Sequence, residues 1–249
     1  MFSFFRTIRK ALFETHMFRM YLGYALGEIL LVIIGILIAL QINNWNEANQ
    51  ARELELRQLA EIKDALAADY IYFNEHIAMR NGYVSDSIEF FENYILTGEL
   101  DDTRVNQQFA RLGWYFQVQF NASPFDALKS SGLDKITNPD LRQGLVHLYD
   151  FIYPRYTQFF QSIIESSLEI FEAEAEVLLG DYELVIIDGK IDDYRRPINT
   201  DDLATNPNFL GAYISAKNRL LSTNRYIDEI KIEMLNTIEL LDQELESET

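Results

Sequence analysis

The sequence of 249 residues contains no cysteine, only three histidines and far fewer basic than acidic side chains. The lack of cysteine excludes disulfides, thiolate catalysis and cysteine-ligated metals. The 21 lysines and arginines face 39 aspartates and glutamates, so the formal net charge is -18. Because binding to phosphates needs an excess of positive charge, we expect no nucleic acid as a partner.

The motifs of common enzymes are also missing. The sequence has no H-E-x-x-H, G-x-S-x-G, P-loop or G-x-G-x-x-G pattern. Neither His76 nor His147 follows a glutamate by three positions, as di-iron bundles require. Lys129-Ser130-Ser131-Gly132 places a serine beside a lysine, but the polar end of a short helix is the simpler interpretation. We therefore predict a protein that is not an enzyme, with no catalytic residues, no metal site and no cofactor; its ligand-binding residues stay unknown.

One long apolar run is present. Residues 22–42 contain a single charged side chain, Glu28, and about 20 apolar residues are enough to cross a bilayer. The run predicts a transmembrane helix over residues 21–44, followed by Trp45 as an interfacial anchor. The alternatives are a buried helix of a soluble protein and a cleaved signal peptide. The run is too long for a signal peptide, and no small-x-small cleavage site follows it.

The two flanks of this run differ in charge. Four basic residues and one acidic residue lie within residues 1–21, whereas residues 43–249 carry 17 basic and 37 acidic side chains. The positive-inside rule then predicts a cytoplasmic N-terminus and places residues 45–249 on the other side of the membrane. Residues 1–20 are expected to form a basic amphipathic helix on the inner leaflet; a merely apolar, partly ordered leader is the alternative.

Small residues recur at helical spacing within the predicted span. Gly23 and Gly27, and further along Gly35 and Ala39, form two small-xxx-small patterns that allow the close approach of another membrane helix. They predict a helix–helix interface in the membrane, and with it a homo-oligomer or a partner membrane protein. The same patterns also arise by chance in membrane helices.

Glu28 is a carboxylate inside the predicted span. Such a group costs about 2.5–3.5 kcal/mol at the bilayer centre, and less near the cytoplasmic end where Glu28 lies. One interpretation is that it snorkels, or pairs with a basic residue of the leader such as Arg19. The other is that it carries a proton or an ion while it faces a partner.

The rest of the chain is dominated by helical periodicity. Three segments have apolar residues at the spacing of long amphipathic helices, and they cover residues 59–97, 139–179 and 207–245. Asn138-Pro139 and Asn206-Pro207 open the second and third, because asparagine caps a helix and proline fits its first turn. Asn81-Gly82 leaves a break open in the first helix, and Pro154 predicts a kink in the second.

Shorter elements fill the interval between the first two helices. Residues 103–115 and 124–131 read as short helices, the latter with Gly132 as its stop. Phe116–Phe120 alternates apolar and polar residues as a strand does, although five residues decide little.

Residues 181–206 form a non-helical insert. Within it, Glu183–Ile191 predicts a small hairpin on an Asp-Gly turn. Four acids of the insert suggest calcium, but their spacing does not match a D-x-[DN]-x-[DN]-G loop, so we expect solvated loop acids. They are Asp181, Asp188, Asp192 and Asp193. The predicted fold is therefore all-α: a transmembrane helix that continues into an antiparallel bundle or coiled coil of long helices, with a hairpin insert.

Three stretches of the sequence are similar to a known family. They are Phe4-Phe5-Arg6-x-Ile8-Arg9, the span with Gly27-Glu28-Ile29 and Ile34–Asn46, and Leu128–Gly132 followed by Asn138–Arg142. They resemble an uncharacterised family of single-pass membrane proteins of Gram-negative bacteria, a domain of unknown function. The resemblance implies a bacterial inner-membrane protein with a periplasmic C-terminal domain, and it supplies no activity or catalytic residues. Both Glu28 and the Ser-Ser-Gly turn belong to the family's pattern.

Two functions fit these features. The first is a membrane-anchored periplasmic helical bundle that acts as a sensor, a scaffold or an accessory subunit of a membrane complex. A pocket near Tyr115, Tyr149 and Tyr153 would favour ligand sensing. The second is a stator-like subunit of an ion-driven inner-membrane complex that uses Glu28, an analogy that rests on topology. In both cases the lipid bilayer is a partner.

Overall fold

A computed structural model describes residues 16–101, 103–187, 190–197 and 202–246, with side chains from Met20 onward except in residues 180–201. The chain forms two compact units, residues 1–56 and 57–249. Most of the predicted amphipathic leader, residues 1–15, lies outside the described residues. The predicted all-α class is confirmed: helices make up nearly all of the described chain.

The first unit consists of helix α2, which spans His16–Ile71 and so extends into the second unit. It contains residues 21–44, the predicted transmembrane segment. Among the described residues, one helical stretch is long and apolar enough to cross a membrane, and it starts with α2. The sequence has no proline before Pro124, so nothing interrupts the backbone hydrogen bonds of this helix.

The second unit is built from three long helical segments. The first is the end of α2, the π-helix η1 (Tyr72–Ile77) and α3 (Ala78–Thr97). The second is α6 (Pro139–Val146), the π-helix η3 (His147–Ile152) and α7 (Tyr153–Leu178). The third is α8 (Pro207–Glu246).

Shorter elements connect these segments. They are α4 (Val105–Leu112), α5 (Ser123–Ser131), the 3-10 turns η2 (Leu133–Lys135) and η4 (Leu203–Thr205), and a hairpin of β1 (Leu179–Ile187) and β2 (Lys190–Pro197). Residues 113–122, between α4 and α5, form no helix or strand, and we call them the connecting segment.

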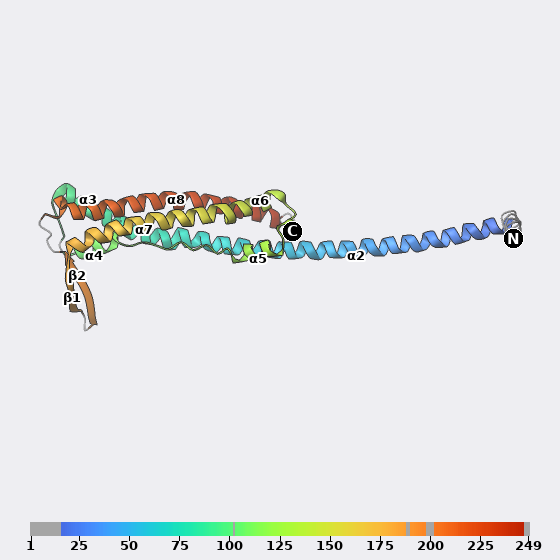
Figure 1. Ribbon diagram of the computed structural model, residues 1–249, viewed down its shortest axis with the longest axis horizontal. Coiled ribbons are helices and arrows are strands. Elements are labelled where there is room, and N and C mark those ends of the chain that lie inside the picture. The colour runs from blue at the N-terminus through green and yellow to red at the C-terminus, as the bar shows by residue number, and fades with distance from the viewer. Residues whose placement is uncertain (1–15, 102, 188–189, 198–201, 247–249) are drawn as a thin grey trace, which may run out of the picture. The chain divides into compact units, whose positions relative to one another are not determined.

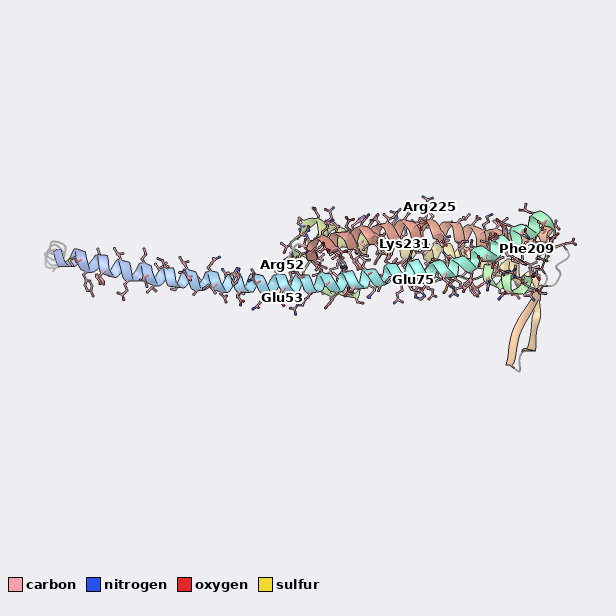
Figure 2. The ribbon with its side chains drawn as sticks, turned by 180° about the vertical axis from the view of Figure 1, so that it is seen from behind. Arg52, Glu53, Glu75, Phe209, Arg225 and Lys231 are labelled. Atoms are coloured by element: carbon pink, nitrogen blue, oxygen red, sulfur yellow. The ribbon has the colours of Figure 1, made fainter. Side chains whose placement is uncertain are left out.

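The chain direction alternates through the unit, as the predicted antiparallel bundle requires. The α2–α3 segment and the α6–α7 segment run the same way, whereas α8 and the path from α4 to α5 run the opposite way (Figure 1). The α4–α5 path thus takes the place of a fourth helix. The connecting segment spans much of the length of the bundle with few residues (Figure 1), because an extended chain rises about 3.3 Å per residue against 1.5 Å in a helix. Helices α8 and η1 lie side by side (Figure 2). The Lys231 ammonium of α8 donates to the side-chain amide oxygen of Asn74 in η1 at 2.8 Å.

The predicted helix starts and stops are confirmed. The Asn138 side chain accepts the backbone N–H groups of Asp140 and Leu141 at 3.0 and 3.2 Å. Asn206 does the same for the first turn of α8. Gly98 ends α3 with φ 75°, a left-handed conformation that glycine adopts without strain.

The two irregularities expected inside the long helices have specific outcomes. Helix α3 continues through Asn81-Gly82 without a break. Before Pro154, the predicted kink takes the form of the π-helix η3, whose wider turn accommodates the missing N–H of proline. The short helix expected over residues 103–115 is shorter, because α4 ends at Leu112.

The insert contains the predicted hairpin. Strands β1 and β2 are antiparallel, and Ile187 pairs with Lys190. The predicted Asp-Gly turn, residues 188–189, lies outside the described residues. The strand register is irregular between Leu179 and Tyr182. The side chains of the four acids of the insert lie outside the described part, so their expected solvation stays a prediction.

The hydrophobic core is divided into two clusters. One lies between α2, η1, η3, α7 and the C-terminal half of α8, and the other between α3, α4, the end of α7 and the start of α8. Polar side chains lie between them in the sequence of α3 and α8. Asn81, between Ile77 of the first cluster and Val84 of the second, donates to Asn224 at 2.6 Å. Ser87 donates to Gln108 at 2.7 Å among the residues of the second cluster. Arg219 of α8 is only 4% exposed.

Candidate ligand-binding groove

The connecting segment is held at three points by side chains from other elements. At its start, Arg219 of α8 donates to the carbonyl oxygens of Leu112 and Trp114. In its middle, the Tyr72 hydroxyl donates to the Gln117 carbonyl at 3.3 Å. Near its end, the backbone N–H of Asn121 donates to Asp69 at 2.9 Å. The segment therefore has a fixed path although it forms no regular structure.

Arg219 is a buried cation without a carboxylate partner in the described chain. Its guanidinium contacts the two carbonyls and, at 3.3 Å, the Ser167 hydroxyl. Burial lowers the pKa of Arg219 to about 10 because the charged form loses its hydration. Leu112 is the last residue of α4 and Trp114 lies two residues beyond it, at the end where the helix dipole is negative, so this position favours a cation. Arg219 thus fixes the point at which α4 ends and the connecting segment begins.

Asp69 fixes the other end and is 7% exposed. Burial raises the pKa of its carboxyl above the usual 3.8, and the hydrogen bond from the Asn121 N–H acts in the opposite direction. The hydroxyls of Tyr149 and Tyr153 are buried nearby and form no hydrogen bond of standard geometry within the described chain. Burial raises the pKa of both tyrosines, and the charge of Asp69 raises it further.

Replacing Asp69 by asparagine is expected to stabilise the protein at neutral pH. Because its pKa is raised on folding, the contribution of Asp69 to stability is fully present below pH 3.8 and is lost as the pH rises through the folded-state value. Asparagine keeps an oxygen for the Asn121 N–H but carries no charge. Urea unfolding between pH 3 and 7 should show a stability gain for Asp69→Asn that grows with pH. Asp64→Asn, at an exposed position of the same helix, should show no such trend. A pH-independent difference for Asp69→Asn would contradict this assignment.

A groove of about 690 Å³ lies between the connecting segment and the helix formed by η1 and α3. This volume is in the range of small-molecule sites. We call it the aromatic groove, and its walls are Tyr72, His76, Ile77, Met79, Arg80, Tyr83, Trp114, Tyr115, Phe116 and Gln117. Among the η1 and α3 residues, Tyr72, His76, Arg80 and Tyr83 follow one another by three or four positions, which places them on one face of the helix. Both walls belong to the second unit.

Trp114 is the centre of a cationic stack at this groove. The Arg80 guanidinium lies 5.5 Å from its ring centre, and the Arg111 guanidinium lies 5.8 Å from it. Arg111 also lies 5.1 Å from the ring of Tyr83, which packs edge-on against Trp114. Neither arginine forms an ion pair with a described residue. In a chain of net charge -18, two arginines without acidic partners beside an open groove are available to bind an anion.

A second hollow, of about 380 Å³, lies on the other side of the connecting segment against α7. Phe116 and Tyr115 border both hollows. The α7 wall contributes Thr157, Phe160, Gln161, Ile164, Glu165 and Leu168. The connecting segment is thus open along both of its sides, because an extended chain is narrower than the helix whose place it takes.

The pocket expected near three tyrosines is found at only one of them. Tyr115 lines the aromatic groove, whereas Tyr149 and Tyr153 are buried and absent from its walls. Tyr149 stacks on Phe125 at 4.5 Å, and Tyr153 stacks on Phe120 at 3.8 Å. These two tyrosines form part of the core beside Asp69.

The residues singled out in the anchor lie on α2 with open surroundings. A side chain added at Gly23, Gly27 or Gly35 would meet no atom of the described chain within 4 Å. Ala39 and Glu28 are exposed, and Trp45 is 66% exposed. The predicted helix–helix interface, the role of Glu28 and the interfacial role of Trp45 therefore stay predictions.

The Lys-Ser-Ser-Gly turn has the structural role expected of it. Lys129 pairs with both carboxylate oxygens of Asp150 at 2.7 Å, so it does not face Ser130 as a base. The hydroxyls of Ser130 and Ser131 donate to backbone carbonyls of α5. Among the described residues, no three histidine, aspartate or glutamate side chains gather where they could hold a metal ion.

The aromatic groove was missed by the sequence analysis. A weak signal existed, because Tyr72, His76 and Arg80 follow one another by four positions along one helical face. That face contrasts with the apolar one through Phe73 and Ile77. Nothing in the sequence indicated that Trp114 and Arg111, more than 30 positions later, would complete it.

The comparisons with known proteins agree with the resemblance noted in the sequence. The model of a family of unknown function (DUF6090) matches residues 28–168, which is more than half of the chain. No curated protein and no solved structure matches the chain. The chain therefore belongs to the family of unknown function DUF6090, and the matched region includes Glu28, the connecting segment and both walls of the aromatic groove.

Proposed function

We propose that this member of the family is a membrane-anchored sensor whose helical domain binds a carboxylate-bearing ligand in the aromatic groove. The observation that carries the proposal is the pair Arg80 and Arg111, stacked on Trp114 beside an open groove without acidic partners in the described chain. A guanidinium binds a carboxylate through two parallel hydrogen bonds, and the aromatic walls suit the apolar body of a ligand.

The anchor completes the proposal. Residues 21–44 of α2 would cross the inner membrane with the N-terminus in the cytoplasm, and residues 45–249 would lie in the periplasm. The positive-inside distribution of the flanking charges supports this orientation. A periplasmic domain would meet extracellular solutes and the periplasmic parts of other membrane proteins, and the groove would then report on one of them.

Binding of benzoate tests the proposal, because benzoate combines one carboxylate with one aromatic ring. The chain has two tryptophans, so Trp45→Phe leaves Trp114 as the only one and its fluorescence reports on the groove. In the full chain in detergent, benzoate should change this fluorescence saturably, and neutral benzamide should not. Arg80→Gln and Arg111→Gln should each weaken benzoate binding at least about tenfold, since a charged hydrogen bond contributes about 1.5–3 kcal/mol.

The matched control for these variants is Arg155→Gln. Arg155 also lies over aromatic rings, those of Phe151 and Phe159 at 5.9 and 5.4 Å, but neither ring belongs to the groove. Arg80 lines the groove itself, and Arg111 lies over Trp114 and Tyr83, which line it. Its substitution should leave benzoate binding unchanged. Equal binding of benzoate and benzamide, or equal losses in all three variants, would refute the groove as an anion site.

A second candidate is the stator-like role for Glu28. It is favoured by the position of Glu28 on the helix: at about 100° per residue, Glu28, Gly35 and Ala39 fall within a narrow arc of α2. A partner helix that packs on the two small residues would therefore face the carboxylate.

The absence of cysteine allows a direct test of this face. Under mild oxidation in membranes, Ala39→Cys should form a disulfide dimer, whereas Leu37→Cys, on the opposite side of the helix, should stay monomeric on a non-reducing gel. Each variant is compared with the cysteine-free chain. Crosslinking of Leu37→Cys as efficient as that of Ala39→Cys would rule out a specific interface on this face.

A further inference from the structure

We propose that the ligand of the aromatic groove is an extended segment of another polypeptide, which pairs with the connecting segment as an added strand. The inference rests on the proposed function, because it assigns the class of ligand to the same groove. A separate observation supports strand pairing: the backbone N–H and C=O groups of residues 115–119 are almost all unpaired, which binding of an anion alone does not require.

The backbone of residues 115–119 is almost entirely unpaired. The Gln117 carbonyl accepts the Tyr72 hydroxyl at 3.3 Å. No other N–H or C=O group of these five residues forms a hydrogen bond with a described part of the chain. An extended chain with free N–H and C=O groups is a ready template for pairing with another strand.

The burial of the segment alternates as in a strand with one face buried. Phe116 is buried, while Tyr115 and Gln117 on either side of it are exposed. Val118 and Phe120 are partly buried and Gln119 is exposed, which continues the alternation. The buried side chains fix the rotation of the segment about its own axis, so its backbone groups point in defined directions.

One edge of the segment faces the aromatic groove. In an extended chain the N–H and C=O of one residue point to the same side, and those of the next residue point to the opposite side. The bond from Tyr72 on η1 shows that Gln117 presents its backbone toward the groove. Tyr115, two positions earlier, presents its N–H and C=O to the same side. A strand placed in the groove would therefore form hydrogen bonds with the N–H and C=O of Tyr115 and with the N–H of Gln117.

The positive charge beside the groove determines which polypeptide segments would bind there. Strand addition obtains affinity from the main chain and specificity from side-chain contacts on alternate residues. Here Arg80 lines the groove, and Arg80 and Arg111 both lie over Trp114 of its wall, so a carboxylate on the added strand beside Trp114 would meet this positive charge. The occupant is thus a polypeptide segment that combines extended backbone with an acidic side chain or a terminal carboxylate.

The test uses the peptide N-acetyl-Thr-Glu-Thr-Glu-Thr-amide and the full chain with Trp45→Phe. Two analogues carry N-methyl groups on alternate backbone amides. In the first analogue the backbone nitrogens of the two glutamates are methylated, and in the second those of the middle and last threonines. Side chains and charge are the same in all three peptides. Since a strand pairs along one edge only, one analogue should bind at least about tenfold more weakly than the parent, and the other should bind about as well.

The outcomes separate this inference from the proposed function. Unequal analogues, together with weaker parent binding in Arg80→Gln, support strand addition in the groove. Equal affinities of the two analogues overturn strand addition, and the groove stays an anion site if benzoate still depends on Arg80 and Arg111. If benzoate binding is also independent of these arginines, both proposals fail.

Discussion

Replacing Arg219 by methionine is expected to lower the free energy of unfolding by about 2–4 kcal/mol, although it removes a costly buried charge. The substitution leaves the carbonyls of Leu112 and Trp114 without their charged donor. Each unsatisfied buried carbonyl costs about 1–3 kcal/mol, and the relief of the buried charge offsets only part of this. Urea unfolding of the full chain in detergent, followed by tryptophan fluorescence, measures the difference.

Arg225→Met is the matched control for this prediction. Arg225 lies on the same helix α8 (Figure 2). Its side chain is 76% exposed, and its ion pair with Glu229 spans one turn. Such surface pairs contribute less than about 1 kcal/mol, so the control should change stability little. If Arg219→Met unfolds at the same urea concentration as the natural chain, Arg219 does not hold the end of α4.

Phe209→Ala is expected to destabilise the protein by about 3–5 kcal/mol, the range found for a large aromatic side chain truncated in a core. Phe209 is 0% exposed and packs edge-on against Phe91 at 5.0 Å. It also lies 6.4 Å from Phe109 and 6.2 Å from Tyr213, so it joins α3, α4 and α8 in the second core cluster. Thermal unfolding followed by circular dichroism measures the effect.

The same substitution at an exposed phenylalanine provides the comparison. Phe151 is 54% exposed, and Phe151→Ala leaves no buried cavity. Its melting temperature should stay within a few degrees of the natural value, because about 1 kcal/mol shifts a domain of this size by about 2–4 °C. Similar shifts for the two variants would show that the cluster around Phe209 does not hold the three helices together.

The elements that the sequence predicted well are those with local causes. The asparagine caps at Asn138 and Asn206 bond to amides two and three positions later, so the signal and its effect lie within one turn. The antiparallel pairing of β1 and β2 was also indicated locally, by the Asp-Gly pair between two apolar or alternating runs. The alternation in Phe116–Phe120 suggested a strand, but the structure has no strand there, because the segment pairs with no other strand of the described chain.

The elements that the sequence did not predict depend on distant partners. The π-helices η1 and η3 shift the helical phase by about one residue, which periodicity over a long window does not resolve. Arg219 resembles many surface arginines in sequence, and its burial follows from the end of α4 more than a hundred positions earlier. Tyr149 and Tyr153 do not share a pocket with Tyr115, because they stack on Phe125 and Phe120 in the core.

The sequence by itself determined an apolar helix of membrane-spanning length, an acidic all-helical body, the points at which its helices begin and end, and the hairpin. These follow from length, charge and interactions between residues a few positions apart. Only the tertiary structure decided that an extended segment takes the place of a fourth helix, and that Arg80, Arg111 and Trp114 meet beside the groove this leaves. The physical reason is that such contacts depend on which faces of distant segments are buried together, and no local pattern specifies that.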